Sequence, residues 1–308
     1  MRGPVGLSRP TGETMQLPWR PIRQRDGTHT PSALSRRLPV PTTTDHRPRP
    51  WPAPADPDRH RGLVVCTEER TPCTANGRRL ATGNHPVELL VPLMHLTDAG
   101  FGIDLATPTG APTVIEHWAM PTDDAAVRAA YDRLETALAE PLDLCALAEG
   151  LDADGPLTGP LPAPLPRTVG LFLPGGHGAL LGLPDDLHLA RLLRWVHDTG
   201  GSTLSLCHGP AALLAAARDG GRFPWAACEA VAFPDRLDRL TPWIGDRPSP
   251  LTWFFGAALA AEGVLLRNTG TSGASWRDRD LVTGDSPEAA DAFGVLAAET
   301  LLEEISAG

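Results

Sequence analysis

Short apolar runs recur along the chain, and segments with helical periodicity follow most of them. The runs at 62–66, 101–105, 168–173 and 202–206 are bounded by turn-forming residues and predict buried strands. The remaining periodic segments predict helices at 86–98, 185–199 and 210–218, strands at 264–266 and 280–283, and a last helix at 286–305. This alternation predicts an α/β fold in which helices sandwich a mostly parallel sheet.

The pattern loosens between about 107 and 166. One helix is predicted at 122–138, where Asp123 and Asp124 favour the positive N-terminal end. The run of glycine and proline at 155–164 is incompatible with regular structure. We therefore expect this segment to form a small cap or insertion and to contribute no core element.

The first 60 residues differ in composition from the rest. They hold 12 of the 33 prolines and 10 Arg against 5 acids, a net charge of +5, so the other 248 residues carry −15. The segment has no sustained apolar period, and we expect a largely disordered extension at 1–60 before the α/β domain at 61–308. It also lacks the apolar stretch of a secretory signal.

Hydropathy, cysteine spacing and net charge of the whole chain argue against several classes of protein. No apolar run approaches the ~18 residues of a membrane span, so we expect no membrane partner and a cytoplasmic location. Five cysteines without repeated spacing argue against a disulfide framework and against a zinc ribbon. The formal net charge of −10 disfavours nucleic acid as the main partner.

Ligands of parallel sheets bind outside the carboxyl ends of the strands, and Cys207 follows the run at 202–206 directly. A cysteine between a strand and a helix occupies the sharp turn of a nucleophile elbow. The helix start is expected to lower the thiol pKa, and His208 offers a base. The other four cysteines lack this context and are interpreted as packing or loop residues.

Two further junctions carry candidate chemistry. In the loop after 168–173, Gly175 and Gly176 could bring backbone N–H groups close to an oxyanion, and His177 could reach the site. Glu88 lies in the first turn of the predicted helix at 86–98, where it either complements the helix dipole or shuttles a proton near the sulfur. A neighbouring thiolate and burial would raise the pKa of this carboxyl group.

A third group must orient the imidazole if Cys207 and His208 act as nucleophile and base. The loop at 233–238 offers Asp235 and Asp238, and spacing alone does not select between them.

The sequence resembles the ThiJ/PfpI superfamily, and specifically its HchA-like branch of glyoxalase III enzymes and protein deglycases. The resemblance covers about residues 60–305 and implies a flavodoxin-like fold. It is carried, in order, by TGNHPVE (82–88), EHWAMP (116–121), LPGGHGAL (173–180), SLCHGPAA (205–212), AFPD (232–235), LTW (251–253) and TGDSP (283–287).

The resemblance implies a role for each matching residue. Cys207 is the nucleophile, His208 and Asp238 complete the triad, and Glu88 is the acid near the sulfur. Gly175, Gly176 and the His208 N–H resemble the oxyanion donors.

Members of this branch can also bind a metal through two histidines and a glutamate. Two of those positions fall at Thr97 and Gly102, so we expect no such metal site and no cofactor. His95, nearby, is interpreted as a helix-surface residue.

The implied activity is a glutathione-independent conversion of methylglyoxal to lactate, or deglycation of protein side chains, in a homodimer. The substrates would be small dicarbonyls or glycated side chains, with nucleic acid only as a glycated substrate. One alternative is a holdase chaperone with weak catalysis, which exposed apolar surface at 107–166 would support. A cysteine amidase or peptidase is a further alternative, which a narrow, capped pocket would oppose.

Overall fold

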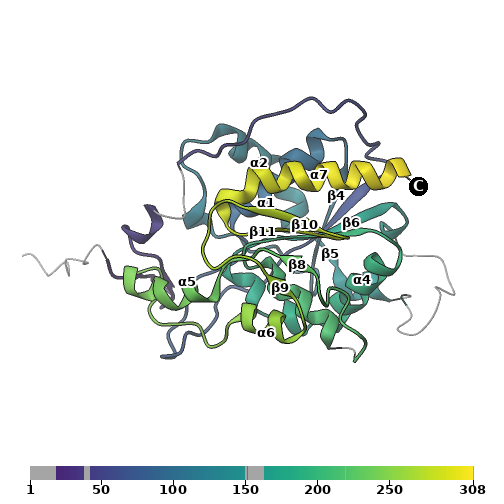
Figure 1. The fold of residues 1–308 in the computed structure, drawn as a ribbon. Helices are drawn as coiled ribbons and strands as arrows, with labels where there is room; N and C mark the ends of the chain where they lie inside the picture. Colours follow the sequence, from purple (N-terminus) through teal and green to yellow (C-terminus); the bar gives the residue numbers. More distant parts are fainter. Residues whose placement is uncertain (1–18, 38–41, 150, 152–162, 219, 308) are drawn as a thin grey trace, which may run out of the picture.

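The computed structural model describes residues 19–37, 42–149, 151, 163–218 and 220–307. Its centre is a seven-stranded sheet with the order β10-β11-β7-β6-β3-β4-β5 (Figure 1). Only the edge pair β10 and β11 is antiparallel, and the other neighbours run parallel. The mostly parallel sheet that the apolar pattern predicts is therefore present.

The strands of this sheet are short and largely buried. They are β3 (Arg61–Val65), β4 (Gly102–Thr107), β5 (Leu142–Asp143), β6 (Thr168–Leu173), β7 (Ser202–Leu206), β10 (Ser275–Asp278) and β11 (Leu281–Gly284). Two small sheets accompany it, formed by β1 (Ile22–Arg23) with β2 (His29–Thr30) and by β8 (Glu229–Ala230) with β9 (Leu265–Leu266).

Helices cover both faces of the sheet. Alternate residues of β3 point to opposite sides, so Leu63 and Val65 belong to one hydrophobic cluster and Val64 to the other. The Val64 side packs against α1 (Pro86–Asp98), α2 (Ala125–Ala139) and α7 (Ala290–Ala307). The opposite side packs against α3 (Leu144–Ala148), α4 (Leu187–Asp198), α6 (Phe255–Ala261) and the 3₁₀ helix Gly209–Ala217. A further helix is α5 (Asp235–Leu240).

The segment at 107–166 differs from the expected cap. Its strand β5 pairs with β4 and forms the edge of the main sheet. In the helix α3 that follows, Leu144, Leu147 and Ala148 are buried, and the helix packs against α4. A two-residue strand leaves no apolar run, which is why the sequence pattern gave no signal for it. Asp124 does cap α2, accepting from the N–H groups of Ala126 and Val127, and the Gly/Pro run falls largely outside the described residues.

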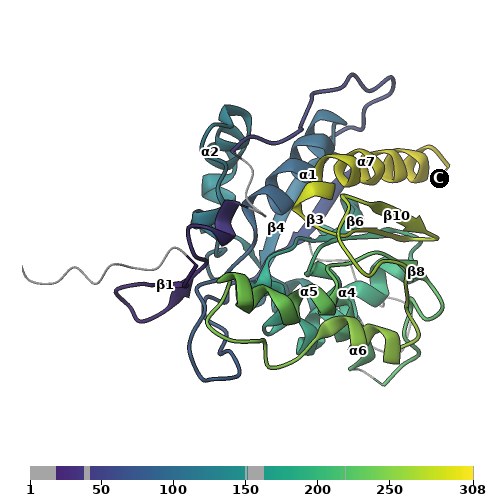
Figure 2. The same cartoon turned by 60° about the vertical axis from the view of Figure 1, so that its left-hand side comes forward.

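The described part of the 1–60 extension also differs from the expectation of disorder. The strand β1 of this extension is labelled in Figure 2. Ser32 donates its N–H to the Gly245 carbonyl, and His29 exchanges backbone hydrogen bonds with Arg79 and Ala81. Further along, the Thr44 hydroxyl donates to Asp124. Backbone and hydroxyl hydrogen bonds, and not an apolar stripe, attach the extension, so hydrophobic periodicity could not detect it.

Two local predictions need correction. The segment at 210–218 is a 3₁₀ helix and not an α-helix. His95 does not lie on the solvent-exposed surface of α1, because its side chain is buried where α1 packs against α7. At Gly294, α7 approaches His95 so closely that an added Cβ would collide with the imidazole. The helix therefore shields the ring from solvent on that side. Among the described residues, no helix combines the length and the apolar character needed to cross a bilayer.

Candidate active site

Cys207 occupies a strained turn between β7 and the following 3₁₀ helix. Its φ is 59°, which is uncommon for a residue other than glycine. The Cys207 N–H donates to the Gly284 carbonyl at 2.8 Å, and its own carbonyl accepts from Phe233 at 2.9 Å. These bonds hold the turn between β7 and β11. Such backbone strain clusters at functional sites, which fits the elbow that the sequence predicts.

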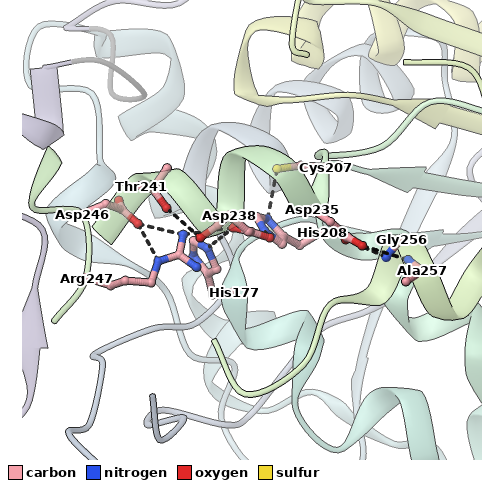
Figure 3. Close-up of polar contacts among 10 residues, drawn as sticks. All are labelled: His177, Cys207, His208, Asp235, Asp238, Thr241, Asp246, Arg247, Gly256 and Ala257. Carbon is pink, nitrogen blue, oxygen red and sulfur yellow. Dashed lines mark hydrogen bonds and ion pairs between the residues drawn. The ribbon is translucent and has the colours of Figure 1, made fainter. Parts of the chain in front are cut away.

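Cys207, His208 and Asp238 form a continuous chain of polar contacts (Figure 3). The Cys207 Sγ lies 3.3 Å from His208 Nδ1, and His208 Nε2 lies 3.0 Å from an Asp238 carboxylate oxygen. The His208 ring stacks on Phe233 with centroids 4.7 Å apart, which restrains its orientation. The structure thus brings together three residues from two separate segments, in the order nucleophile, base and orienting acid.

Asp235 has a different place from Asp238. Its carboxylate accepts from the N–H groups of Gly256 and Ala257, both at 2.9 Å, in the first turn of α6. Asp235 therefore accepts hydrogen bonds from the free N–H groups at the start of α6 and does not take part in the chain of contacts from Cys207 to Asp238. Of the two acids that spacing left open, Asp238 is the one in contact with His208.

Arg247 is the counter-ion of Asp238 and was not anticipated from the sequence. Its Nη2 lies 3.0 Å from Asp238 and 2.8 Å from Asp246, and its side chain is 1% exposed. Burial opposes ionisation of Asp238, but the charges of His208 and Arg247 and the hydrogen bonds from the imidazoles hold its pKa well below the ordinary value. A buried carboxylate calls for a cationic partner, yet nothing in the sequence indicates which arginine supplies it.

Glu88 projects from the first turn of α1 and is 1% exposed. Burial raises its pKa to about 8, with the thiol of Cys207 as its hydrogen-bonding neighbour. Neither carboxyl oxygen has an N or O partner among the described residues. Gly175 packs directly on this carboxyl group, because a Cβ at that position would overlap it. Glu88 is therefore a neutral acid held against the sulfur at neutral pH.

The Cys207 thiol differs from the sequence-based expectation. Burial, together with the Glu88 carboxyl group, raises its pKa well above the ordinary value, although the His208 N–H acts in the opposite direction. The helix start that should have favoured the thiolate is a 3₁₀ turn inside an apolar pocket, and desolvation outweighs it. The sulfur therefore carries its proton in the resting site, with His208 Nδ1 placed to accept it.

The loop at 174–178, which follows β6, lies beside Glu88 and Cys207. Gly176 has a φ of 107°, which other residues rarely adopt, and a Cβ there would overlap Gly83 and His85. The N–H groups of Gly175 and Gly176 donate to no other described residue. The His177 side chain approaches Asp238 at 3.5 Å and packs against His208, and burial lowers its pKa to about 4.

A cavity of about 370 Å³ opens over Cys207. Its wall includes predicted residues, namely Glu88, Gly176, His177, Cys207 and His208, and residues to which the sequence assigned no role, namely His85, Glu116, Trp118 and Arg247. His85 and Glu116 are ionisable groups kept neutral, since burial lowers the pKa of His85 to about 3 and raises that of Glu116 to about 8. Three of these four lie in the segments 82–88 and 116–121, which carry the family resemblance.

The remaining sequence candidates lie elsewhere. Thr97, at an expected metal position, donates its hydroxyl to carbonyls of its own helix, and Gly102 has no side chain to offer. The other four cysteines are absent from the cavity wall among the described residues.

A mostly parallel sheet with a cysteine elbow at the carboxyl ends of its strands defines an α/β protein with a candidate nucleophile site. The chain belongs to the HchA protein/nucleic acid deglycase family. It is 41% identical over 244 residues to protein/nucleic acid deglycase 1 of Escherichia coli K12, covering 79% of this chain and 82% of that protein. The HchA deglycase of E. coli O157:H7 matches with the same identity and coverage.

Solved structures share the fold at lower identity. Glyoxalase III from Candida albicans superposes with a TM-score of 0.60 at 20% identity, covering 78% of this chain and 98% of that one. Rapid Encystment Protein 24 KDa of Francisella tularensis gives a TM-score of 0.61 at 18% identity, covering 79% and 99%. No protein-family model matches the chain.

Proposed function

We propose that this protein is a glutathione-independent glyoxalase and deglycase that uses Cys207 as its nucleophile. The observation that carries the proposal is the chain from Cys207 through His208 to Asp238, with the neutral acid Glu88 beside the sulfur. The relatives named deglycases support the reaction class. The cavity of about 370 Å³ suits a small dicarbonyl or a single modified side chain and opposes an extended peptide.

The first step is attack of sulfur on an aldehyde. His208 Nδ1 takes the thiol proton, and Asp238 stabilises the imidazolium through its contact with Nε2. The C–S bond forms as the carbonyl π electrons move to oxygen, which gives a hemithioacetal. The free N–H groups of Gly175 and Gly176 are candidates to stabilise that oxygen.

The second step is an internal redox reaction that needs no external oxidant. Glu88 or His208 moves a proton from the hemithioacetal carbon to the neighbouring carbon, so the first carbon is oxidised to a thioester and the second is reduced to an alcohol. Water then hydrolyses the thioester, which releases lactate and restores the thiol. On a glycated side chain, the former aldehyde carbon already carries the amine or thiol of the adduct. The Cys207 sulfur bonds to this carbon as the bond to the amine or thiol breaks, and the leaving group takes the thiol proton through His208. The same hemithioacetal results and reacts as above.

A second groove supports nucleotides as one class of glycated substrate. It has a volume of about 760 Å³ and is lined by arginines and exposed tryptophans, among them Arg23, Arg78, Trp19 and Trp243. Arg247 lines both this groove and the Cys207 cavity. Arginine and aromatic side chains together suit a phosphate with a base. A chain that is acidic overall can therefore still accept a modified nucleotide near its nucleophile.

The test is lactate formation from methylglyoxal without glutathione. Cys207→Ala should abolish it, because no other cysteine lines the cavity among the described residues. Cys66→Ala is the matched control, since Cys66 is equally buried but lies outside the cavity wall. Wild-type turnover by folded Cys207→Ala protein would exclude this mechanism.

A further inference from the structure

A second cluster of ionisable side chains lies away from the Cys207 cavity. It joins three segments, because His46 comes from the extension, His95 from α1 and Asp291 from α7. His46 Nδ1 lies 3.2 Å from His95 Nε2, which lies 2.8 Å from Asp291 Oδ1, and the third side of the triangle is 3.8 Å. The side chains are 3%, 1% and 34% exposed in the same order.

Hydrogen bonds alone pair the polar atoms of His46, His95 and Asp291 poorly. A proton on His95 Nε2 must be shared between His46 and Asp291, which both lie within hydrogen-bond distance. If His46 Nδ1 carries the proton instead, His95 Nε2 turns its lone pair toward the carboxylate at 2.8 Å. The His95 proton then moves to Nδ1, which is buried and has no partner among the described residues. Each arrangement leaves a buried polar atom badly paired.

The triangle has the dimensions of a metal-binding face. Zinc–nitrogen and zinc–oxygen bonds of about 2.0–2.2 Å in a tetrahedron separate neighbouring ligand atoms by about 3.3–3.6 Å. The three measured separations of 2.8, 3.2 and 3.8 Å bracket that range. Two neutral imidazoles and one carboxylate are a donor set that suits Zn²⁺ and Co²⁺, and the partly exposed Asp291 leaves the fourth position open to water.

We propose that His46, His95 and Asp291 bind a divalent transition-metal ion of the Zn²⁺ type. This site is separate from Cys207, since none of its residues lines the cavity, and it uses neither Thr97 nor Gly102. The ion connects the extension to the pair α1 and α7. The Thr44 hydroxyl already contacts Asp124 two residues before His46, so the backbone around the site is held in place. The role that follows is structural: the ion fastens residues 42–60 onto the helical layer.

The experiment uses the full-length chain, stripped with a chelator and titrated with Zn²⁺ by calorimetry and with Co²⁺ by visible absorption. Wild type should bind one equivalent that His46→Ala and Asp291→Asn bind about 100-fold more weakly or not at all. His197→Ala is the matched control, because His197 contacts Asp280 at 2.6 Å in a His–Asp pair that lacks a second histidine. Retention of the same equivalent by His46→Ala and Asp291→Asn would overturn the site.

Two readouts separate this site from the catalytic one. Zn²⁺ should slow proteolysis of the 42–60 segment in wild type and in His197→Ala, but not in His46→Ala. Methylglyoxal turnover should be unchanged by His46→Ala, since this residue lies outside the cavity wall. His46→Ala truncates an extension residue and not a core residue, so circular dichroism should show an intact fold. Equal protection by Zn²⁺ in wild type and in His46→Ala would also contradict the proposal.

Discussion

At the residue scale, the site combines one strongly acidic carboxyl group with two that resist ionisation. Asp238 keeps its charge because Arg247 and His208 contact it, whereas Glu88 and Glu116 keep their protons because burial isolates them from water. Environments that separate the pKa values of like groups assign them different roles. Here Asp238 is suited to stabilise an imidazolium and Glu88 to donate and accept a proton at the sulfur.

Glu88→Gln tests that assignment through both activity and stability. The folded pKa of about 8 exceeds the ordinary value of 4.5, so between these values the unfolded chain ionises while the folded chain keeps its proton. The contribution of Glu88 to the free energy of unfolding therefore falls as pH rises from about 4.5 to about 8. Glutamine cannot ionise, so we expect a higher Tm than wild type at neutral pH together with a kcat that is about 100-fold lower. Thermal unfolding and lactate assays over pH check both; a normal kcat would remove Glu88 from the mechanism.

Arg247→Met tests the counter-ion. Loss of the guanidinium leaves Asp238 buried with imidazoles alone, which should raise the pKa of Asp238 and lower stability by about 3–5 kcal/mol. The acid limb of the kcat profile should then move to higher pH, because Asp238 becomes protonated sooner as pH falls. Arg236→Met removes an exposed arginine from α5, the helix that carries Asp238, and should leave the profile unchanged. An unshifted acid limb in folded Arg247→Met would show that Arg247 has no electrostatic influence on Asp238.

At the scale of elements, the site depends on how closely the loops between strands and helices approach one another. Gly209 follows the elbow, and a Cβ there would overlap the Leu173 carbonyl of β6 and the Ser205 hydroxyl of β7. Gly175 likewise has room for no side chain beside Glu88. Glycines at these loops allow β6, β7 and α1 to converge on the sulfur.

Gly209→Ala should therefore displace the elbow without changing any catalytic side chain. We expect a loss of about 1–3 kcal/mol in the free energy of unfolding, as for an overpacked core, with a lower kcat. Gly270→Ala is the control, because a Cβ at Gly270 meets no atom nearby. Chemical denaturation and lactate assays measure the two effects. Equal stability of the two variants would show that the elbow has room for a Cβ.

The elements also show what the sequence could predict. Continuous apolar runs indicated β3, β4, β6 and β7, and the family motifs indicated Cys207, His208, Asp238 and Glu88 near their carboxyl ends. Strand β5 has only two residues and β10 is half-buried, so neither produces an apolar period. A contact between two individual side chains in a loop region, such as that of Arg247 with Asp238, leaves no periodic signal at all.

At the scale of the whole molecule, the two exposed tryptophans lie at the arginine-rich groove, whereas the described part of the segment at 107–166 exposes little apolar surface. In the described part of that segment, Leu142 is the exposed large hydrophobic residue, at 36%. In contrast, Trp243 is 85% and Trp19 is 52% exposed, and both line the arginine-rich groove. The described part of the segment at 107–166 therefore gives the holdase alternative no support.

The arginine-rich groove leads to a prediction about nucleotide substrates, which an assay with methylglyoxal alone cannot test. Under the proposed function, methylglyoxal would lie wholly inside the Cys207 cavity, whereas a methylglyoxal adduct of a guanine nucleotide would place its phosphate outside, where Arg78 is exposed. We therefore expect Arg78→Ala to raise the KM for the nucleotide adduct about tenfold, as for one lost charge-assisted hydrogen bond. The KM for methylglyoxal should stay unchanged.

Arg191→Ala provides the comparison, because Arg191 is an exposed arginine on α4 that does not line the groove. Added salt should weaken the effect of Arg78→Ala, since a phosphate contact at an exposed site is screened by ions. A KM for the nucleotide adduct that is the same in Arg78→Ala and Arg191→Ala would show that the bound phosphate does not lie next to Arg78. A KM raised equally for nucleotide and methylglyoxal would instead indicate a disturbed Arg247, which lines both spaces.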